Sequence, residues 1–234
     1  MTTQTKDSVY DPELAFLAEV ESIELPEEDD QNMESPWHRL AMNLLIHLLT
    51  SFWRSRTDFY VGGNMFIHFD LETVRKRSFR GPDFFVVKNV DSQQDRTSWV
   101  IWQEGGRYPD MILELLSPST AEYDKNEKRR FYQNVFRTPE YFCYDPNHQE
   151  LLGWALSERG KYQPLELNEN GHLWSNELQL WLGTWSGEYE NTNSTWLRFY
   201  DPNGNLIPTQ LEASETELHR LQTELEKLRT EKNR

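Results

Sequence analysis

The chain has 234 residues and a formal net charge of −15 at pH 7, and 37% of its residues are hydrophobic. This length suits one substantial domain with appendages and is too short for two large domains. Uncharged apolar stretches fall short of the ~18 residues that a membrane span requires, so we expect no membrane span. The single cysteine, Cys143, cannot form an internal disulfide, and no secretory signal opens the chain. Together these features predict a cytoplasmic protein.

The negative charge is concentrated at the N-terminus. Residues 1–36 carry eleven carboxylates against Lys6 alone, and residues 37–210 are left with about −4. Basic clusters lie at residues 75–80 and 125–130. We therefore expect residues 1–34 to form a separate acidic segment. The charge of the remainder is compatible with DNA binding, which usually requires a basic face.

Apolar residues recur at helical spacing over residues 37–52, behind a capping Ser35 and a first-turn Pro36. This pattern predicts an amphipathic helix of about 18 residues. Extended segments are expected next, at residues 59–61, 65–69, 84–87, 99–102 and 111–116. The third and fifth segments are nearly continuous apolar runs, which is typical of strands covered on both faces.

The residues Ser119-Thr120-Ala121-Glu122 fit a capping box, which predicts a helix from there to about Phe136. Its spacing places Lys128, Phe131, Tyr132 and Val135 on one face, which we expect to lie on the sheet. A strand at 141–144 and a hairpin of 151–156 with 161–164 follow. One helix, a sheet, a second helix and more strands predict an α+β (mixed α/β) domain over residues 35–185.

Two appendages are expected after this domain. Residues 186–210 are predicted to form a Trp-rich hairpin extension, with a turn at 201–204 that joins two short strands. Residues 211–234 predict a coiled-coil helix of about three heptads, and with it a homodimer. A solvated helix that packs back on its own domain is the alternative, because three heptads are marginal in isolation. The heptad positions are occupied by Leu211, Leu218 and Leu225, and by Ser214, Leu221 and Leu228.

Glu114 lies inside an apolar run, and Ile112 and Leu116 share its face of the expected strand. A buried ionised carboxylate needs a cation, a metal or strong hydrogen-bond donors. Lys128, on the following helix, is expected to point to the same region, and Lys125 is the alternative one turn earlier. Two simpler interpretations remain open: Glu114 reaches solvent at a strand end, and Lys128 forms only a surface pair with Asp124.

Asp83 immediately precedes the apolar strand at 84–87. Two carboxylates at strand ends and one lysine are the groups that metal-dependent phosphodiester hydrolysis uses. The carboxylates bind Mg²⁺ or Mn²⁺, and the lysine orients the nucleophile or stabilises charge on the phosphate. We therefore predict Asp83, Glu114 and Lys128 as catalytic residues, with Asp83 and Glu114 as metal ligands. A Pro-Asp step before a strand is also an ordinary turn.

Three parts of the sequence together resemble the Uma family (Uma-two) of restriction-endonuclease-like proteins, in the PD-(D/E)xK nuclease superfamily. They are residues 109–120, the set Asp124, Lys128 and Tyr132, and residues 140–146. The resemblance extends over about residues 35–185. It implies a four-stranded mixed core sheet flanked by helices, metal-bound carboxylates at one edge of that sheet, and DNA as the substrate.

Within this resemblance, Asp83 matches the Pro-Asp acid and Glu114 the acid of the (D/E)xK element. Leu116 stands at the position of the motif's lysine, and the resemblance gives that role to Lys128. His38 matches a histidine that is common in the family, with capping or packing as alternative roles. Residues that fit a supporting role are Ser117, Tyr132, Asp124, Lys125 and, on a weaker match, Glu104.

The sequence thus predicts a Mg²⁺- or Mn²⁺-dependent DNA endonuclease. It departs from the family at its start, where the acidic stretch that ends at residues 33–35 replaces an acidic helix and a Gly-Glu hairpin. A metal ligand from the first helix is therefore unassigned. This departure and the net charge favour a second hypothesis, a catalytically weak or inactive nuclease-fold protein that acts in binding or assembly.

Overall fold

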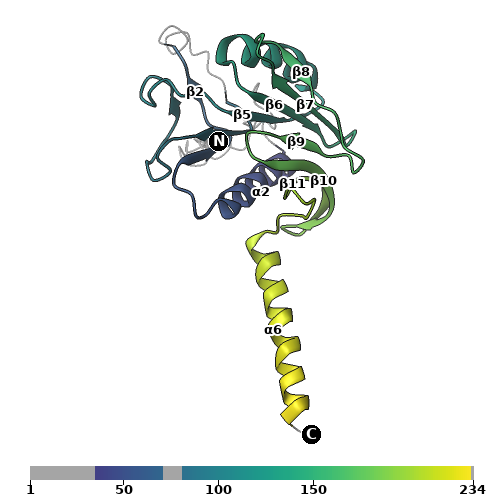
Figure 1. Ribbon diagram of the computed structural model, residues 1–234. Helices are drawn as coiled ribbons and strands as arrows, with labels where there is room; N and C mark the ends of the chain where they lie inside the picture. The colour runs from purple at the N-terminus through teal and green to yellow at the C-terminus, as the bar shows by residue number, and fades with distance from the viewer. Residues whose placement is uncertain (1–34, 71–80, 233–234) are drawn as a thin grey trace, which may run out of the picture. The chain divides into compact units, whose positions relative to one another are not determined.

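The computed structural model describes residues 35–70 and 81–232, so the acidic segment 1–34 and the basic cluster at 75–80 lie outside the described residues. A six-stranded sheet has the order β1-β3-β5-β6-β7-β8 (Figure 1). β5 and β6 are parallel, whereas the other neighbours are antiparallel. The predicted α+β class with a mixed sheet is confirmed. The strands are β1 (Phe59–Gly62), β3 (Phe84–Lys88), β5 (Met111–Leu115), β6 (Glu140–Asp145), β7 (Glu150–Leu156) and β8 (Tyr162–Pro164).

The central strands bury both faces, as their continuous apolar runs predict. Side chains alternate along each strand, so neighbouring residues enter different cores. On β5, Leu113 belongs to the first core and Ile112 to the second, which places Glu114 on the second face. The residues of β3, β5 and β6 that lie in the first core are Phe84, Val86, Met111, Leu113, Leu115, Phe142 and Tyr144. Those of the same three strands in the second core are Phe85, Val87, Ile112, Tyr141 and Cys143.

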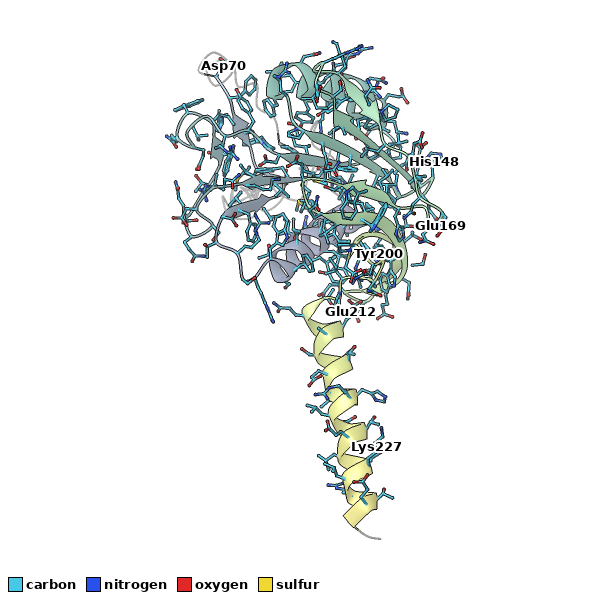
Figure 2. The ribbon with its side chains drawn as sticks, in the orientation of Figure 1. Asp70, His148, Glu169, Tyr200, Glu212 and Lys227 are labelled. Carbon is cyan, nitrogen blue, oxygen red and sulfur yellow. The ribbon has the colours of Figure 1, made fainter. Side chains whose placement is uncertain are left out.

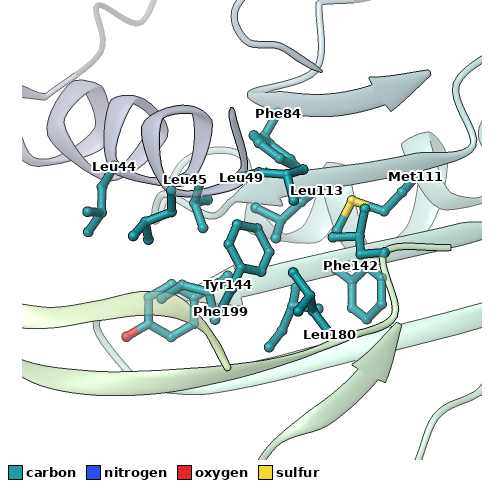
Figure 3. Close-up of a cluster of buried hydrophobic side chains, with 14 of the residues drawn as sticks. Leu44, Leu45, Leu49, Phe84, Met111, Leu113, Phe142, Tyr144, Leu180 and Phe199 are labelled. Atoms are coloured by element: carbon teal, nitrogen blue, oxygen red, sulfur yellow. The ribbon is translucent and has the colours of Figure 1, made fainter. Parts of the chain in front are cut away.

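The first core is closed by helix α2 (Pro36–Phe52) and by a second sheet (Figure 3). That sheet has the order β11-β10-β9, with β9 at Leu173–Ser175, β10 at Leu180–Tyr189 and β11 at Thr192–Tyr200. Trp37 stacks on Trp196 of β11, with ring centroids 5.8 Å apart. The predicted first helix is confirmed, and this packing fixes the first turn of α2, which carries His38.

The second core is closed by a helical segment over residues 121–136 and by the short parallel pair β2 (Ile67–His68) and β4 (Trp99–Val100). The helical segment includes two π-helical turns. It consists of α4 (Ala121–Tyr123), η1 (Asp124–Lys128), α5 (Arg129–Phe131) and η2 (Tyr132–Phe136). The predicted extent of this helix is confirmed.

One detail predicted for this helix is wrong. Val135 is 46% exposed, and Phe136 takes the buried place. π-Helical turns hold more residues than α-helical turns, and this rotates the later residues relative to the sheet. The residue that precedes the helix, Thr120, has helical backbone angles and makes no capping side-chain bond. Its hydroxyl lies 3.0 Å from that of Ser117.

The predicted boundary at residue 185 falls within β10, which pairs with β11 from Trp181 to Tyr189. The turn at 201–204 joins the nine-residue β11 to a single bridge, Tyr200 with Leu206, rather than to a second strand. The final helix α6 spans Gln210–Lys232. In the part of the chain that the structure describes, no helix is long and apolar enough to cross a membrane.

Leu45 provides a test of the packing that holds α2. It is fully buried, and its replacement by Ala leaves a cavity between the two sheets. We expect Leu45→Ala to lower the free energy of unfolding by about 2–5 kcal/mol, as measured by urea denaturation. The control is Phe52→Ala on the same helix, where the side chain is 43% exposed. The account of α2 is contradicted if both substitutions have the same small effect.

Candidate active site

Glu114 is the buried centre of the candidate site. It lies on β5, between the paired strands β3 and β6, and its side chain is fully buried. The Tyr132 hydroxyl donates a 3.0 Å hydrogen bond to Glu114 Oε1. Lys128 Nζ lies 3.1 Å from Oε2. Both partners come from the helix that covers this face, so the expected convergence of Glu114 and Lys128 is observed.

Asp83 lies beside Glu114 at the start of β3. Its amide donates to Glu114 Oε2 over 3.3 Å. Its own carboxylate accepts a 2.7 Å hydrogen bond from the Leu115 amide, through Oδ2. His38 Nε2 lies 3.0 Å from Oδ1. The antiparallel register of β3 and β5 therefore brings the two carboxylates together, and α2 adds the histidine.

Asp124 is the third carboxylate of the cluster. Its Oδ1 lies 2.8 Å from Lys128 Nζ, and its side chain is only 3% exposed. The lysine therefore bridges two buried carboxylates and is not part of a surface pair. Asp124 and Lys128 begin and end the π-helical turn η1. The Tyr141 hydroxyl donates to the backbone carbonyl of Asp124 and ties this turn to β6.

The electrostatics of the cluster follow from its burial. Burial raises the pKa of Glu114 from 4.5 to about 8, against the opposing effect of Lys128. Asp83 and Asp124 add to the rise. Burial alone would lower the pKa of Lys128, but Glu114 and Asp124 outweigh it, so its pKa lies above the ordinary value of 10.5. The lysine therefore stays charged at neutral pH, and the shared negative charge makes Glu114 hard to ionise.

This charge balance suits a divalent cation. If Glu114 loses its proton when a cation binds, three carboxylates and the protonated Lys128 leave a charge of −2. Oxygen ligands from one or two carboxylates, completed by water and phosphate, are the usual protein site for Mg²⁺. Among the residues that the structure describes, no group of three or more His, Cys, Asp or Glu side chains is arranged to hold one metal ion. A metal at this site would therefore have only Asp83 and Glu114 as carboxylate ligands, with water or phosphate completing its coordination.

Three of the residues singled out for supporting roles contact other partners. Glu104 forms an ion pair with Arg96 over 2.7 Å. Lys125 forms one with Glu150, also over 2.7 Å. The Ser117 hydroxyl lies within 3.1 Å of the hydroxyls of Ser119 and Thr120, in the turn before the helix. By contrast, His38, Asp124 and Tyr132 directly contact Asp83, Lys128 and Glu114, respectively.

Two groups that hold the carboxylates of the site in position were not predicted from the sequence. The Leu115 amide holds Asp83, and the Asp83 amide holds Glu114. Both are backbone groups, which no residue type indicates. The pairing of β3 with β5, rather than with a sequence neighbour, places them in contact. Only knowledge of that pairing would have identified them.

Comparisons with known proteins give a family for this fold and site. A model of the Uma2 family, described as "Putative restriction endonuclease", matches residues 16–186. The chain belongs to the Uma2 family. The Uma2 match begins inside the acidic segment 1–34 and ends within β10. It contains each residue of the carboxylate–lysine cluster, which consists of Asp83, Glu114, Asp124 and Lys128.

Two further similarities were found. The chain is 32% identical over 96 residues to "Uncharacterized protein sll1609" of Synechocystis sp., a match that covers 38% of this chain and 51% of that protein. It thus spans about half the length of this curated relative. A solved structure of "a putative nuclease belonging to DUF820 from Anabaena variabilis" has 12% identity and a TM-score of 0.46. That match covers 63% of this chain and 76% of the other.

The raised pKa of Glu114 predicts a pH effect on the metal-free protein. Between about pH 4.5 and about pH 8, the native state holds a proton that unfolded Glu114 has lost. Stability therefore falls as the pH rises across this window. Glu114→Gln removes this titration, so we expect the free energy of unfolding of the variant to fall less steeply with pH than that of the wild type. The two slopes should differ by at most about 1.4 kcal/mol per pH unit, the value for one proton.

This slope is measured by urea denaturation at a series of pH values in the presence of EDTA. The control is Glu150→Gln, which removes a half-exposed carboxylate that pairs with Lys125 rather than with a partner of Glu114. It should retain the slope of the wild type. Equal slopes for wild type and Glu114→Gln would show that Glu114 does not titrate abnormally.

Proposed function

We propose that the protein is a divalent-metal-dependent DNA endonuclease that hydrolyses phosphodiester bonds at the carboxylate–lysine cluster. The observation that carries this proposal is the position of Lys128. Its Nζ contacts the carboxylates of both Glu114 and Asp124, and Asp83 lies beside Glu114. Membership of Uma2, a family described as "Putative restriction endonuclease", supports the same chemistry. A metal bound there would supply an activated water and neutralise charge that develops on the phosphate.

Each residue has a distinct part in this proposal. Asp83 and Glu114 would hold Mg²⁺ or Mn²⁺ through their carboxylate oxygens. Lys128 orients the attacking water or stabilises negative charge on the phosphate. Tyr132 and the Leu115 amide hold the two carboxylates in position, as their hydrogen bonds indicate. His38 holds Asp83 from the other side.

The alternative is a nuclease-fold protein that binds or assembles without turnover. The net charge of −15 favours it, because a strongly acidic chain repels DNA at long range. The buried cluster favours catalysis instead. Three carboxylates around one lysine are costly to bury, and a purely structural role would be served as well by apolar residues of similar volume. Metal binding and turnover separate the two functions.

Metal binding is tested by thermal unfolding with Mn²⁺ and Mg²⁺. We expect the wild-type Tm to rise by about 3–6 °C at an ion concentration about ten times the Kd. Asp83→Asn should abolish this rise, because the amide can still accept from Leu115 but cannot supply a charged ligand. Glu150→Gln is the matched control and should retain the full rise. An unchanged wild-type Tm in the presence of either ion at millimolar concentrations would contradict the metal site.

Turnover is tested by nicking of supercoiled plasmid in the presence of Mn²⁺ or Mg²⁺. Lys128→Ala should lower the rate about 10²- to 10³-fold, as expected for loss of one electrostatic group at the reacting phosphate. The matched control is Lys125→Ala, which removes a lysine of the same helix that pairs with Glu150. Its rate should stay within about twofold of wild type. Equal loss in both variants would remove Lys128 from the mechanism.

A further inference from the structure

We propose that α6 pairs with α6 of a second copy of this chain as a parallel, in-register, two-stranded coiled coil. The first observation is a row of exposed leucines. Along α6 the exposed fractions are 68% for Leu211, 57% for Leu218, 45% for Leu221, 50% for Leu225 and 60% for Leu228. They do not pack back on the described part of their own domain, so the alternative of a helix covered by its own chain is not observed.

The spacing of these leucines assigns every position of the repeat. Leu211, Leu218 and Leu225 occupy position a, and Ser214, Leu221 and Leu228 occupy position d. Threonines fill the outward position f, at residues 216, 223 and 230. In a coiled coil, the positions e and g flank the apolar seam and decide orientation and partner. On α6, position e holds Glu215, Gln222 and Arg229, and position g holds Glu217, Glu224 and Glu231.

The flanking charges favour the parallel arrangement. In a parallel pair, each g residue faces the e residue five positions later in the partner, so Glu224 meets Arg229 of the other copy. Glu217 meets the neutral Gln222, and no like charges oppose each other at these two contacts. In an antiparallel pair, g residues face g residues, which sets glutamate against glutamate. Both helices of the pair have the same sequence, so each copy contributes Glu224 to one contact and Arg229 to the other.

The start of α6 is firmly attached to the domain. Thr209 and Glu212 form a reciprocal capping box: the Glu212 amide donates to Thr209 Oγ1 over 3.2 Å, and the Thr209 amide donates to Glu212 Oε2 over 2.6 Å. The buried Arg198 of β11 donates to Glu212 over 2.7 Å. Figure 2 shows Glu212 at this end of α6 and Lys227 farther along it. A parallel coil therefore places both domains at the same end of the coil.

Cysteine cross-linking tests the orientation directly. The chain's own Cys143 is buried, so an introduced thiol dominates under mild oxidation. In a parallel in-register pair, Ser214→Cys places two thiols in the same layer of the seam. We expect it to form an interchain disulfide in most of the protein, whereas Thr216→Cys, on the outward face, does not. Equal cross-linking of both variants, or none with Ser214→Cys, overturns the parallel register.

A charge exchange tests the pairing of Glu224 with Arg229, by sedimentation equilibrium of the full chain over a concentration series. The wild type should approach twice the monomer mass of 28.0 kDa. Glu224→Lys and Arg229→Glu should each weaken the dimer Kd about tenfold, because like charges then face each other. The double variant should restore it. A wild type that stays monomeric or forms trimers, or a double variant as weak as the single variants, overturns the proposal.

Discussion

The carboxylate of Glu114 lies in the interior of a mixed sheet, where its charge needs partners, and most of the site follows from that constraint. A strand with both faces covered gives a side chain no route to solvent. The helix over residues 121–136 supplies Lys128 and Tyr132. The neighbouring strand β3 supplies the amide of Asp83. The carboxylate is thus accommodated by one cation and two hydrogen bonds drawn from different elements.

The same constraint explains the composition of the cluster. One lysine cannot balance three carboxylates. Burial raises the pKa of Glu114, Lys128 opposes that rise, and the charges of Asp83 and Asp124 add to it. A site that is short of positive charge without a ligand is suited to bind a divalent cation. It would do so in competition with the proton on Glu114, so that metal binding and deprotonation are coupled. An ion pair that served stability alone would not need this excess of acid.

The fold and much of the site could be predicted from the sequence, for physical reasons that differ by residue. Glu114 was predictable because strand alternation fixes its face, and Lys128 because it follows on the next helix. The burial of Val135 was predicted wrongly, because it depends on π-helical turns, which residue types do not specify. The contact of Asp83 with Leu115 depends on the pairing of β3 with β5, a long-range choice that local patterns do not encode.

The acidity of the chain affects how the site would meet its substrate. Lys125 and Arg130 on the covering helix are each paired with a glutamate, so their charge is partly neutralised. Among the described residues of this helix, Lys128 together with a bound metal would therefore supply much of the local attraction for a phosphate. The proposed activity would therefore depend on metal occupancy.

The most direct test of the central claim is an anomalous diffraction experiment on crystals of the wild-type protein grown with Mn²⁺. We predict an anomalous peak in contact with the carboxylates of both Asp83 and Glu114, close to Lys128, and its loss in crystals of Asp83→Asn. Peaks confined to other acidic residues, with none at this pair, would contradict the assignment of the cluster as a metal-dependent active site.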